Sequence, residues 1–527
     1  MTTTTALTEV HLINVPLENN YEHTLYFETQ GQQLNYFRNL FRDDASAYTC
    51  TYQRREKLIR YPSHYDLIKG YNYVVFKNEI VKDNGVIKQF TTYAFINKME
   101  YINDKRTDIY IETDVMQTYM FDMNVKQSFV EREHVNDDTF GKHTLDEGLE
   151  TGEYVNVNSY KWWELTNCDV VIGSTVDPET LEGKTGGVYG NIYSGVKYYT
   201  YDDKEDVTRA LQNIATNKDV SAISSLFLAP KFLLDKTNHV VLQTAIAKTL
   251  YSSVFVMQEK LDGYTPKNKK LLCYPYNYLL ADVKNGGAST YRWEHFAYQP
   301  NTSEKAVQFI AYGVLTPGCS IIINPLQYCG IGDNHIHGMT MGKFPQCNWA
   351  TDQYTNWLTQ NGVNIGGLTI DANMYRQQTA GLSMIGEALT LNAEGVMNSF
   401  GTVLDCMVER NKAQMIPPQT GGNINCGDVL SANNLLTLHL FQMTIRKEYA
   451  QKIDKFFDMY GYKVNEVKTP LKNHRKEYWF TKTIAVNIEG SIPNDDLEII
   501  KRCYNNGITF WKHPENIRNY SVDNSII

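Results

Sequence analysis

The chain has 527 residues, and a prior of about 150 residues per domain gives roughly three to four domains. Its 50 basic and 59 acidic residues give a formal net charge of -9, with 42% apolar and 21% charged residues. This composition is globular, and it argues against a protein that wraps nucleic acid, because phosphate neutralisation needs clustered Lys and Arg. The 37 Tyr and 21 Phe favour strands over long helical bundles, since aromatic rings suit the half-buried surface of a sheet.

The cysteines point to folding in a reducing compartment. The nine Cys are scattered and never spaced as Cys-x-x-Cys, which argues against a disulfide framework and against a zinc ribbon. The N-terminal residues show no basic segment followed by an apolar run, so we expect no secretory signal. Folding in a reducing cytoplasm is the simplest interpretation.

The N-terminal part predicts an antiparallel meander followed by an acidic loop. Apolar residues alternate from Tyr71 to Met120, ending in a strand that includes Ile109 and Val115, and Asn84-Gly85 supplies a tight turn. The residues from Glu131 to Glu153 carry eight carboxylates and no periodicity. We interpret them as a solvated acidic loop, since they lack the order of a calcium-binding loop.

The middle and C-terminal parts predict further strands and three helices. Strand-like runs occupy 187–201, 270–280 and 306–324, with a helix over 205–215. Near the C-terminus, helical spacing from Ile445 to Tyr460 ends at Gly461, a residue suited to a left-handed cap. A strand over 478–488, a helix from Pro493 to Gly507 and a strand over 508–511 complete a compact α/β unit.

Between these parts lies a long apolar zone. Apolar residues recur there at helical spacing and form one stripe, whose contact positions are Leu382, Ile385, Leu389, Val396, Phe400, Val403 and Met407. Glu387 and Glu394 interrupt the zone, and it holds no stretch long enough for a permanent transmembrane helix. The stripe has two interpretations: a helix in a core or bundle seam, or a segment stored against neighbouring subunits and released to bury its stripe in lipid.

Three patterns resemble chemical sites and are incomplete. Gly183-Lys184-Thr185 lacks the earlier glycine of a phosphate-binding loop, so we reject nucleotide binding there. His335 and His337 have the spacing of metal ligands, but a metal site needs further ligands that the sequence does not place. Cys329 lies nearby, but no local sequence signature supports it as a nucleophile. We therefore predict no catalytic residue, no metal site and no cofactor.

Several long phrases resemble a known family. They are LINVPLENNYEHTLYF, ETDVMQTYMFDMNVKQSFVEREHV, LDEGLETGEY, GKFPQCNWATDQYTNWLTQNGVNIG, YAQKIDKFFDMYGYKVNEVKTP and KTIAVNIEGSIPNDDLEIIKRCYNNGITFWKHP. Together they closely resemble the tail knob, or distal tail tube, proteins of small short-tailed bacteriophages. The resemblance spans most of the chain and is weakest from about Tyr201 to Lys343.

The resemblance implies a structural virion protein at the tail tip, assembled in the host cytoplasm. Six copies would form a ring that prolongs the tail tube, with apolar loops that plug the channel until genome ejection and then help to penetrate the host membrane. The implied partners are further copies of the chain, the lower collar or proximal tail protein, double-stranded DNA in the lumen and the host cytoplasmic membrane. Four strands from each of six subunits, at about 4.8 Å per strand, would give a wall of about 37 Å backbone diameter, which admits duplex DNA.

The fold class that we predict is α+β and mostly β. Antiparallel sheets would form a tube wall in a ring, with a C-terminal α/β unit and a long apolar loop insertion. The expected parts are a tube-wall domain (1–160), a middle knob domain (161–355), a plug loop (356–432) and a C-terminal unit beside the first domain (433–527). The boundaries of the movable loop are predicted at Gly366, Gly367, Pro417, Pro418, Gly421 and Gly422.

Two alternative functions stay open from sequence. One is a tail-tip cell-wall hydrolase, with Cys329, His335 and His337 as its site, and the other is a receptor-binding protein that acts as a monomer. Neither has a signature comparable to the phrases that resemble the tail knob family.

Overall fold

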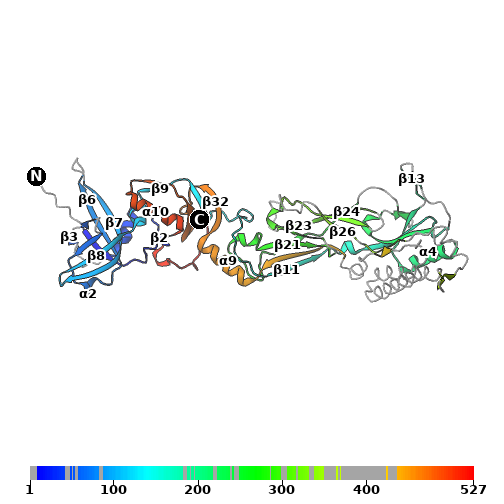
Figure 1. Cartoon of the computed structure of the whole chain (residues 1–527), viewed down its shortest axis with the longest axis horizontal. Coiled ribbons are helices and arrows are strands. Elements are labelled where there is room, and N and C mark those ends of the chain that lie inside the picture. The colour runs from blue at the N-terminus through cyan, green and yellow to red at the C-terminus, as the bar shows by residue number, and fades with distance from the viewer. Residues whose placement is uncertain are drawn as a thin grey trace. The chain divides into compact units, whose positions relative to one another are not determined.

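A computed structural model of the chain, shown in Figure 1, divides into two compact units. The first unit comprises residues 1–150, 266–271 and 448–527, and the second comprises 151–265 and 272–447. The structure describes residues 9–41, 48–49, 52–53, 57–81, 87–181, 187–189, 192–194, 196–217, 222–234, 236–237, 240–241, 248–284, 287–297, 305–315, 319–330, 338–342, 344–348, 364–365, 368–369, 423–424 and 436–527.

A seven-stranded antiparallel sheet forms the N-terminal part of the first unit, in the order β3-β1-β6-β7-β8-β5-β4. Its strands are β1 (Glu9–Ile13), β3 (Tyr48–Thr49), β4 (Tyr52–Gln53), β5 (Leu58–Tyr61), β6 (Tyr73–Val81), β7 (Ile87–Asn103) and β8 (Arg106–Thr113). The predicted meander β6-β7-β8 is confirmed, with Tyr73 opposite Phe95 and Ile96 opposite Ile111. The predicted Asn84-Gly85 turn lies outside the described residues.

This sheet curls back on itself. Its two terminal strands, β3 and β4, are joined by only two residues, and three steps of about 3.8 Å between Cα atoms bring Thr49 and Tyr52 within about 11 Å. The concave face therefore encloses a core of its own, which is capped by Ile68 of α2 (Tyr65–Ile68). The buried residues of this core are Val10, Leu12, Ile59, Tyr61, Ile68, Val74, Phe76, Ala94, Ile109 and Ile111.

The predicted continuation of β8 through Val115 is wrong. The strand ends at Thr113, and Asp114 begins the short helix α3 (Val115–Thr118) by accepting hydrogen bonds from the backbone N–H groups of Met116 and Gln117, each at 3.1 Å. A carboxylate at an N-cap satisfies amides that have no partner within the helix, which ends the alternating pattern here.

The second sheet of the first unit joins N- and C-terminal segments, in the order β2-β35-β33-β10-β32. Its strands are β2 (His23–Leu25), β10 (Ser128–Glu133), β32 (Tyr462–Lys468), β33 (Tyr478–Ile484) and β35 (Ile508–Trp511). A pair of short strands, β9 (Met123–Val125) and β34 (Ile488–Gly490), lies in the same unit. One core, which includes Phe37 of α1 (Gln30–Asn39), Tyr73, Trp479 and Trp511, spans both sheets.

The two C-terminal helices confirm the sequence prediction closely. Helix α9 (Lys447–Tyr460) is followed by Gly461 at φ 63°, and α10 (Asn494–Asn506) begins after Pro493 and ends at Gly507, where φ is 96°. Both glycines occupy the left-handed region that L side chains rarely adopt. Strand β35 coincides with the predicted strand over 508–511.

The second unit consists mainly of antiparallel sheets. One has the order β17-β18-β15-β12-β16-β27-β30, another β11-β31-β21-β22, and a third β19-β24-β25-β26. Their strands are β11 (Tyr154–Lys161), β12 (Cys168–Ser174), β15 (Lys197–Tyr201), β16 (Ile223–Pro230), β17 (Lys236–Thr237), β18 (Val240–Val241), β19 (Lys248–Tyr251), β21 (Asn277–Asp282), β22 (Ala288–Tyr291), β24 (Phe309–Val314), β25 (Ser320–Pro325), β26 (Met339–Met341), β27 (Gln346–Asn348), β30 (Asn423–Ile424) and β31 (His439–Ile445). The pairs β13 (Gly187–Tyr189) with β14 (Ile192–Ser194), and β20 (Phe255–Val256) with β23 (Ala306–Val307), are separate.

Helix α4 (Lys204–Asn217) confirms the helix predicted over 205–215. It covers β15 and β12, with Val207, Leu211 and Ile214 buried against Val170 and Tyr199. The strand expected over 270–280 is only half correct. Residues Lys269–Leu272 form a 3-10 turn, and β21 begins at Asn277. The turn forms because polar groups of the first unit bind its backbone, which a hydropathy pattern does not encode.

Candidate functional site

The residues predicted to form the plug lie outside the described residues, and so do the six predicted loop boundaries. The strands that flank the zone are described. At its start, β28 (Asn364–Ile365) pairs with β29 (Leu368–Thr369), on either side of the predicted Gly366-Gly367 boundary. At its end, β30 follows directly after the predicted Gly421-Gly422 boundary.

The two ends of this long segment lie beside each other. Strand β27 pairs with β30 in antiparallel register, with Cys347 opposite Ile424 and Asn348 opposite Asn423. The chain therefore leaves one sheet after residue 348 and returns to the same sheet at residue 423. Residues 349–422 are an insertion with adjacent ends at the β30 edge of the seven-stranded sheet of the second unit.

The convex side of β5, β8 and β7 is polar. Arg60 of β5 lies opposite Asp108 of β8, which lies opposite Glu100 of β7. The guanidinium Nε of Arg60 is 3.9 Å from a carboxylate oxygen of Asp108, and Lys98 forms an ion pair with Glu100. Both cations of these rows are thus neutralised by carboxylates of the same face.

Tyr110 and Glu112 extend this polar face. The hydroxyl of Tyr110 donates to Glu100 at 2.9 Å, and Glu112 accepts from the side-chain amide of Asn97 at 3.1 Å. Together with the rows above, the face presents the carboxylates of Glu100, Asp108 and Glu112 and the cations Arg60, Lys98 and Arg106. Its charges therefore balance, while the other face of the same strands is the buried core of the curled sheet.

An apolar row is exposed on the second sheet of the first unit. Phe129 of β10 lies opposite Val467 of β32 on one side and opposite Ile484 of β33 on the other. The exposed fractions of Phe129, Val467 and Ile484 are 37%, 70% and 53%. We call these three residues the apolar row. Ion pairs border it, with Glu131 at 2.9 Å from Lys482 and Lys126 at 3.1 Å from Glu489.

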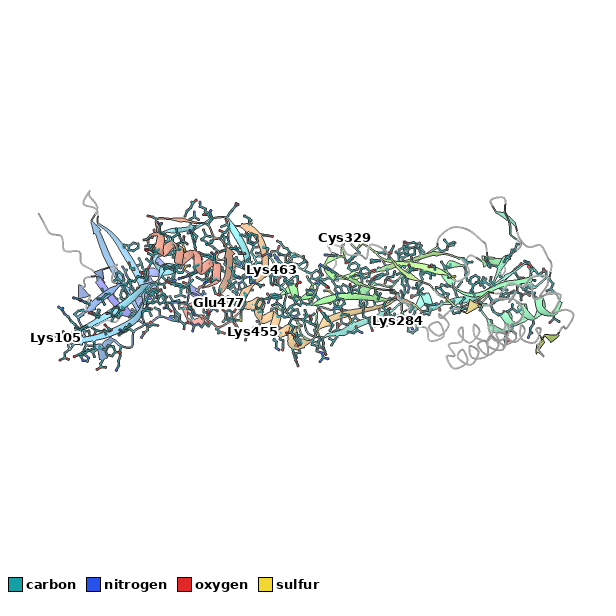
Figure 2. The ribbon with its side chains drawn as sticks, viewed as in Figure 1. Lys105, Lys284, Cys329, Lys455, Lys463 and Glu477 are labelled. Carbon is teal, nitrogen blue, oxygen red and sulfur yellow. The ribbon has the colours of Figure 1, made fainter. Side chains whose placement is uncertain are left out.

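A second group of exposed apolar residues lies in the β7-β8 hairpin, whose turn Lys105 marks in Figure 2, and in α2, which contacts β7. Leu67 of α2, Tyr101 and Ile102 are 71%, 51% and 51% exposed. Nearby ion pairs again provide a polar border, including Lys69 with Asp66 at 2.9 Å. We call these three residues the hairpin cluster. An apolar centre with a charged border is the usual arrangement of a protein interface.

Sequence reasoning missed both apolar surfaces. Strand alternation assigns one apolar face to each strand, and it cannot show that Phe129 and Val467 face outward once β10 and β32 pair. The only signal was weak: Val467 stands between Glu466 and Lys468, an arrangement typical of an exposed strand.

The acidic stretch from Glu131 to Glu153 corrects the prediction of a solvated loop. The side chains of Glu133 and Glu147 are 0% exposed, and both form ion pairs, with Lys468 and with Arg132 respectively. Buried carboxylates are retained where cations and amides partner them. Part of this stretch is therefore structural core, and Glu131–Glu133 belong to β10.

The alternative hydrolase site is only partly described. Cys329 is exposed on the second unit (Figure 2), and its Sγ lies 3.9 Å from the carbonyl oxygen of Gln327. His335 and His337 lie outside the described residues, so a nucleophile and base pair there stays a prediction. Among the residues that the structure describes, no group of three or more His, Cys, Asp or Glu side chains is arranged to hold a metal ion.

No helix in the described part of the chain is long and apolar enough to cross a membrane.

Comparisons with known proteins agree with this architecture. Residues 6–125 match the model of the caudoviral major tail protein N-terminus, and residues 242–525 match the C-terminal domain of the Bacillus phage phi29 tail knob protein gp9. The tail knob protein gp9 of Bacillus phage phi29 is 26% identical over 611 aligned positions, which cover 98% of each chain. The tail knob protein gp9 of Bacillus phage PZA is also 26% identical, again over 98% of each chain.

A solved structure supports the fold. The tail knob protein gp12 of bacteriophage C1 superposes with a TM-score of 0.60 at 13% identity, covering 99% of this chain and 100% of that one. The class defined by these observations is a structural protein of a bacteriophage tail. Within that class, the chain belongs to the family of the phi29 tail knob protein gp9.

Proposed function

We propose that this protein forms the distal tail tube of the virion as a six-membered ring around a channel for the viral genome. The observation that carries the proposal is the pairing of β27 with β30, which makes residues 349–422 a long insertion with adjacent ends. Such an insertion can leave its sheet and enter a channel while the sheet stays folded. Its partners in the virion would be the lower collar or proximal tail protein.

Two exposed surfaces of the first unit support a ring. A closed ring of identical copies needs a heterologous contact, in which one surface of a subunit meets a different surface of its neighbour. The apolar row and the hairpin cluster are two such surfaces in one unit, each apolar at its centre and charged at its border. We propose that neighbouring copies cover the apolar row.

Replacement of one exposed valine tests the ring. Val467→Asp places a charge in the centre of the apolar row, and we expect it to shift the assembled protein to monomers in native mass spectrometry, because burying an unpaired carboxylate is costly. Val254→Asp is the matched control, since Val254 is 56% exposed in the second unit. If Val467→Asp assembles as well as the control does, the apolar row is not the contact.

The polar face of β5, β7 and β8 suits the lining of the channel. A basic lining would bind phosphate and hold the genome, whereas a face whose charges balance does not. Three carboxylates of this face balance its three cations, of which Arg60 and Lys98 are each paired with a carboxylate. We propose that this face borders the passing DNA.

The insertion is proposed to plug the channel and then to contact the host cytoplasmic membrane. Its stripe, from Leu382 to Met407, supplies apolar side chains at helical spacing, and Glu387 and Glu394 limit how deeply it inserts while they are ionised. Two strand pairs would anchor the insertion at its ends: β28 with β29, and β27 with β30.

Dye release from anionic liposomes tests the membrane step with the full chain. We expect the double variant Leu389→Asp and Phe400→Asp to release at least tenfold less dye than the wild type, because two carboxylates on the stripe oppose burial in lipid. The double variant Leu389→Ile and Phe400→Leu keeps the stripe apolar and should retain release. Equal release from all three proteins would show that the stripe does not contact lipid.

A further inference from the structure

A six-residue segment of the chain belongs to a different unit from its neighbours. The chain lies in the second unit up to Thr265, in the first unit from Pro266 to Leu271, and in the second unit again from Leu272. We call Pro266–Leu271 the strap. It carries three lysines, Lys267, Lys269 and Lys270, and its last residue, Leu271, is 0% exposed.

Helix α9 holds the first half of the strap through one carboxylate. Asp454, which is 1% exposed, accepts hydrogen bonds from the backbone N–H of Lys267 at 2.8 Å and of Asn268 at 3.0 Å. The side-chain amide of Asn268 also donates to Asp454 at 2.8 Å and to Asp458, one turn further along α9, at 2.9 Å. The backbone of the strap is thus bound as the amides at a helix start are bound by a cap.

The acidic stretch holds the second half. Asp138 accepts from the backbone N–H of Lys269 at 3.0 Å. Glu147, whose side chain is 0% exposed, forms an ion pair with Lys270, whose side chain is only 3% exposed. The ammonium of Lys270 also lies 5.3 Å from the ring centre of Tyr462 and 5.9 Å from that of Phe457.

Glu147 joins three segments at one point. Besides Lys270, it pairs with Arg132 of β10 and accepts from the backbone N–H of Lys463 of β32 at 3.0 Å. Loss of its charge would remove the carboxylate that Lys270 and Arg132 share. Breaking a buried ion pair from one side is far more costly than breaking an exposed one.

We propose that the strap is a releasable latch, locked by Glu147, that sets how many chain segments connect the two units. With the strap bound, the chain crosses between the units after residues 150, 265, 271 and 447; with the strap released, only the crossings after 150 and 447 remain. Four connections restrain relative movement more than two do. The latch would therefore couple the tube-wall unit to the unit that carries the insertion, a role that does not depend on the ring.

Trypsin digestion of the full chain tests the latch, because Lys267, Lys269 and Lys270 are cleavage sites only when the strap is released. We expect Glu147→Gln to be cut at these sites at least tenfold faster than the wild type, with strand β10 still protected from hydrogen exchange. The matched control is Glu131→Gln, in the same acidic stretch, where Glu131 forms a half-exposed pair with Lys482. We expect the control to be cut at the wild-type rate.

A second variant and a second measurement keep the test decisive if Glu147→Gln misfolds. Lys270→Met removes the other charge of the pair, and hydrogen exchange of the wild type reports the strap directly. We expect slow exchange at the amides of Lys267, Asn268 and Lys269, and faster exchange there in Lys270→Met. The proposal is overturned if these amides exchange at solvent rates in the wild type, if both variants are cut at the wild-type rate, or if faster cutting always accompanies loss of protection in β10.

Discussion

At the scale of single residues, the buried His134 and the partly buried His474 of the first unit make stability depend on pH. The Nδ1 atom of His134 accepts from the backbone N–H of Phe480 at 2.7 Å, and His474 contacts the carbonyl oxygen of His134 at 2.9 Å. Burial, with the nearby Arg475, lowers the pKa of His134 to about 3 and the pKa of His474 to about 4. Both rings are therefore neutral in the folded protein at every pH where it is expected to function.

The sign of the pH dependence follows from these values. The unfolded chain takes up protons at its histidines below about pH 6.5, whereas the folded chain does not until about pH 3 to 4. Stability from the neutral rings is full above pH 6.5 and is lost as the pH falls. Asp114 acts in the opposite sense, because burial raises the pKa of its carboxyl to about 6.

Replacement of His134 isolates its contribution. His134→Asn keeps a hydrogen-bond acceptor for Phe480 and removes the titration. Between pH 7.5 and pH 5 we expect its unfolding free energy to fall by about 2 kcal/mol less than that of the wild type. Urea unfolding at the two pH values measures this, with His513→Asn, at a side chain that is 50% exposed, as control. An unchanged pH dependence in His134→Asn would contradict the account.

At the scale of secondary-structure elements, sequence patterns predicted local structure and the meander β6-β7-β8, but not the contacts between segments that are distant in sequence. The helical spacing before Gly461 and the Pro493 and Gly507 boundaries identified α9 and α10 almost to the residue. These signals are local, since capping and backbone freedom belong to single positions. The turn at Lys269–Leu272 could not be predicted, because the carboxylates that bind the strap are distant from it in sequence. These carboxylates belong to Asp138, Glu147 and Asp454.

In the candidate surfaces, too, the sequence predicted local features and missed those formed by segments that meet only in the fold. The polar alternation of β8 was readable, whereas the apolar row depends on three strands that meet only in the folded sheet. The positions of the plug residues stay predictions, as do the predicted domain boundaries. Burial of Glu147 was also unreadable, because a run of carboxylates without periodicity is more often exposed to solvent.

Gly461 offers a test of how α9 is joined to β32. Its φ is 63°, and a Cβ atom there would lie 2.2 Å from the carbonyl oxygen of Glu133, so both backbone strain and a clash oppose a side chain. We expect Gly461→Ala to lower the unfolding free energy by at least about 3 kcal/mol. Gly148→Ala separates the two causes, because Gly148 has φ 68° with nothing within 4 Å, and it should cost about 1 kcal/mol. Thermal unfolding of the two variants measures both losses of unfolding free energy. Equal losses would mean that the backbone near Glu133 moves to accommodate the Cβ atom at no cost.

At the scale of the whole molecule, the N-terminal region matches a caudoviral major tail protein and the C-terminal region matches a tail knob protein. The first unit contains both chain ends, residues 1–150 and 448–527, and the second unit carries the insertion between β27 and β30. We propose that the first unit forms the wall of the tube and that the insertion enters its lumen. In this proposal the apolar row makes the contact between copies, the polar face lines the channel and the latch couples the two units.

Electron microscopy of the assembled protein tests the central claim most directly. The account predicts a particle with sixfold symmetry and an axial channel wide enough for duplex DNA. Its wall would place β5, β7 and β8 around the lumen, and density for residues 349–422 would occupy the channel before ejection. A native particle that is monomeric, or a ring whose axis is filled by the folded sheets themselves, would contradict it.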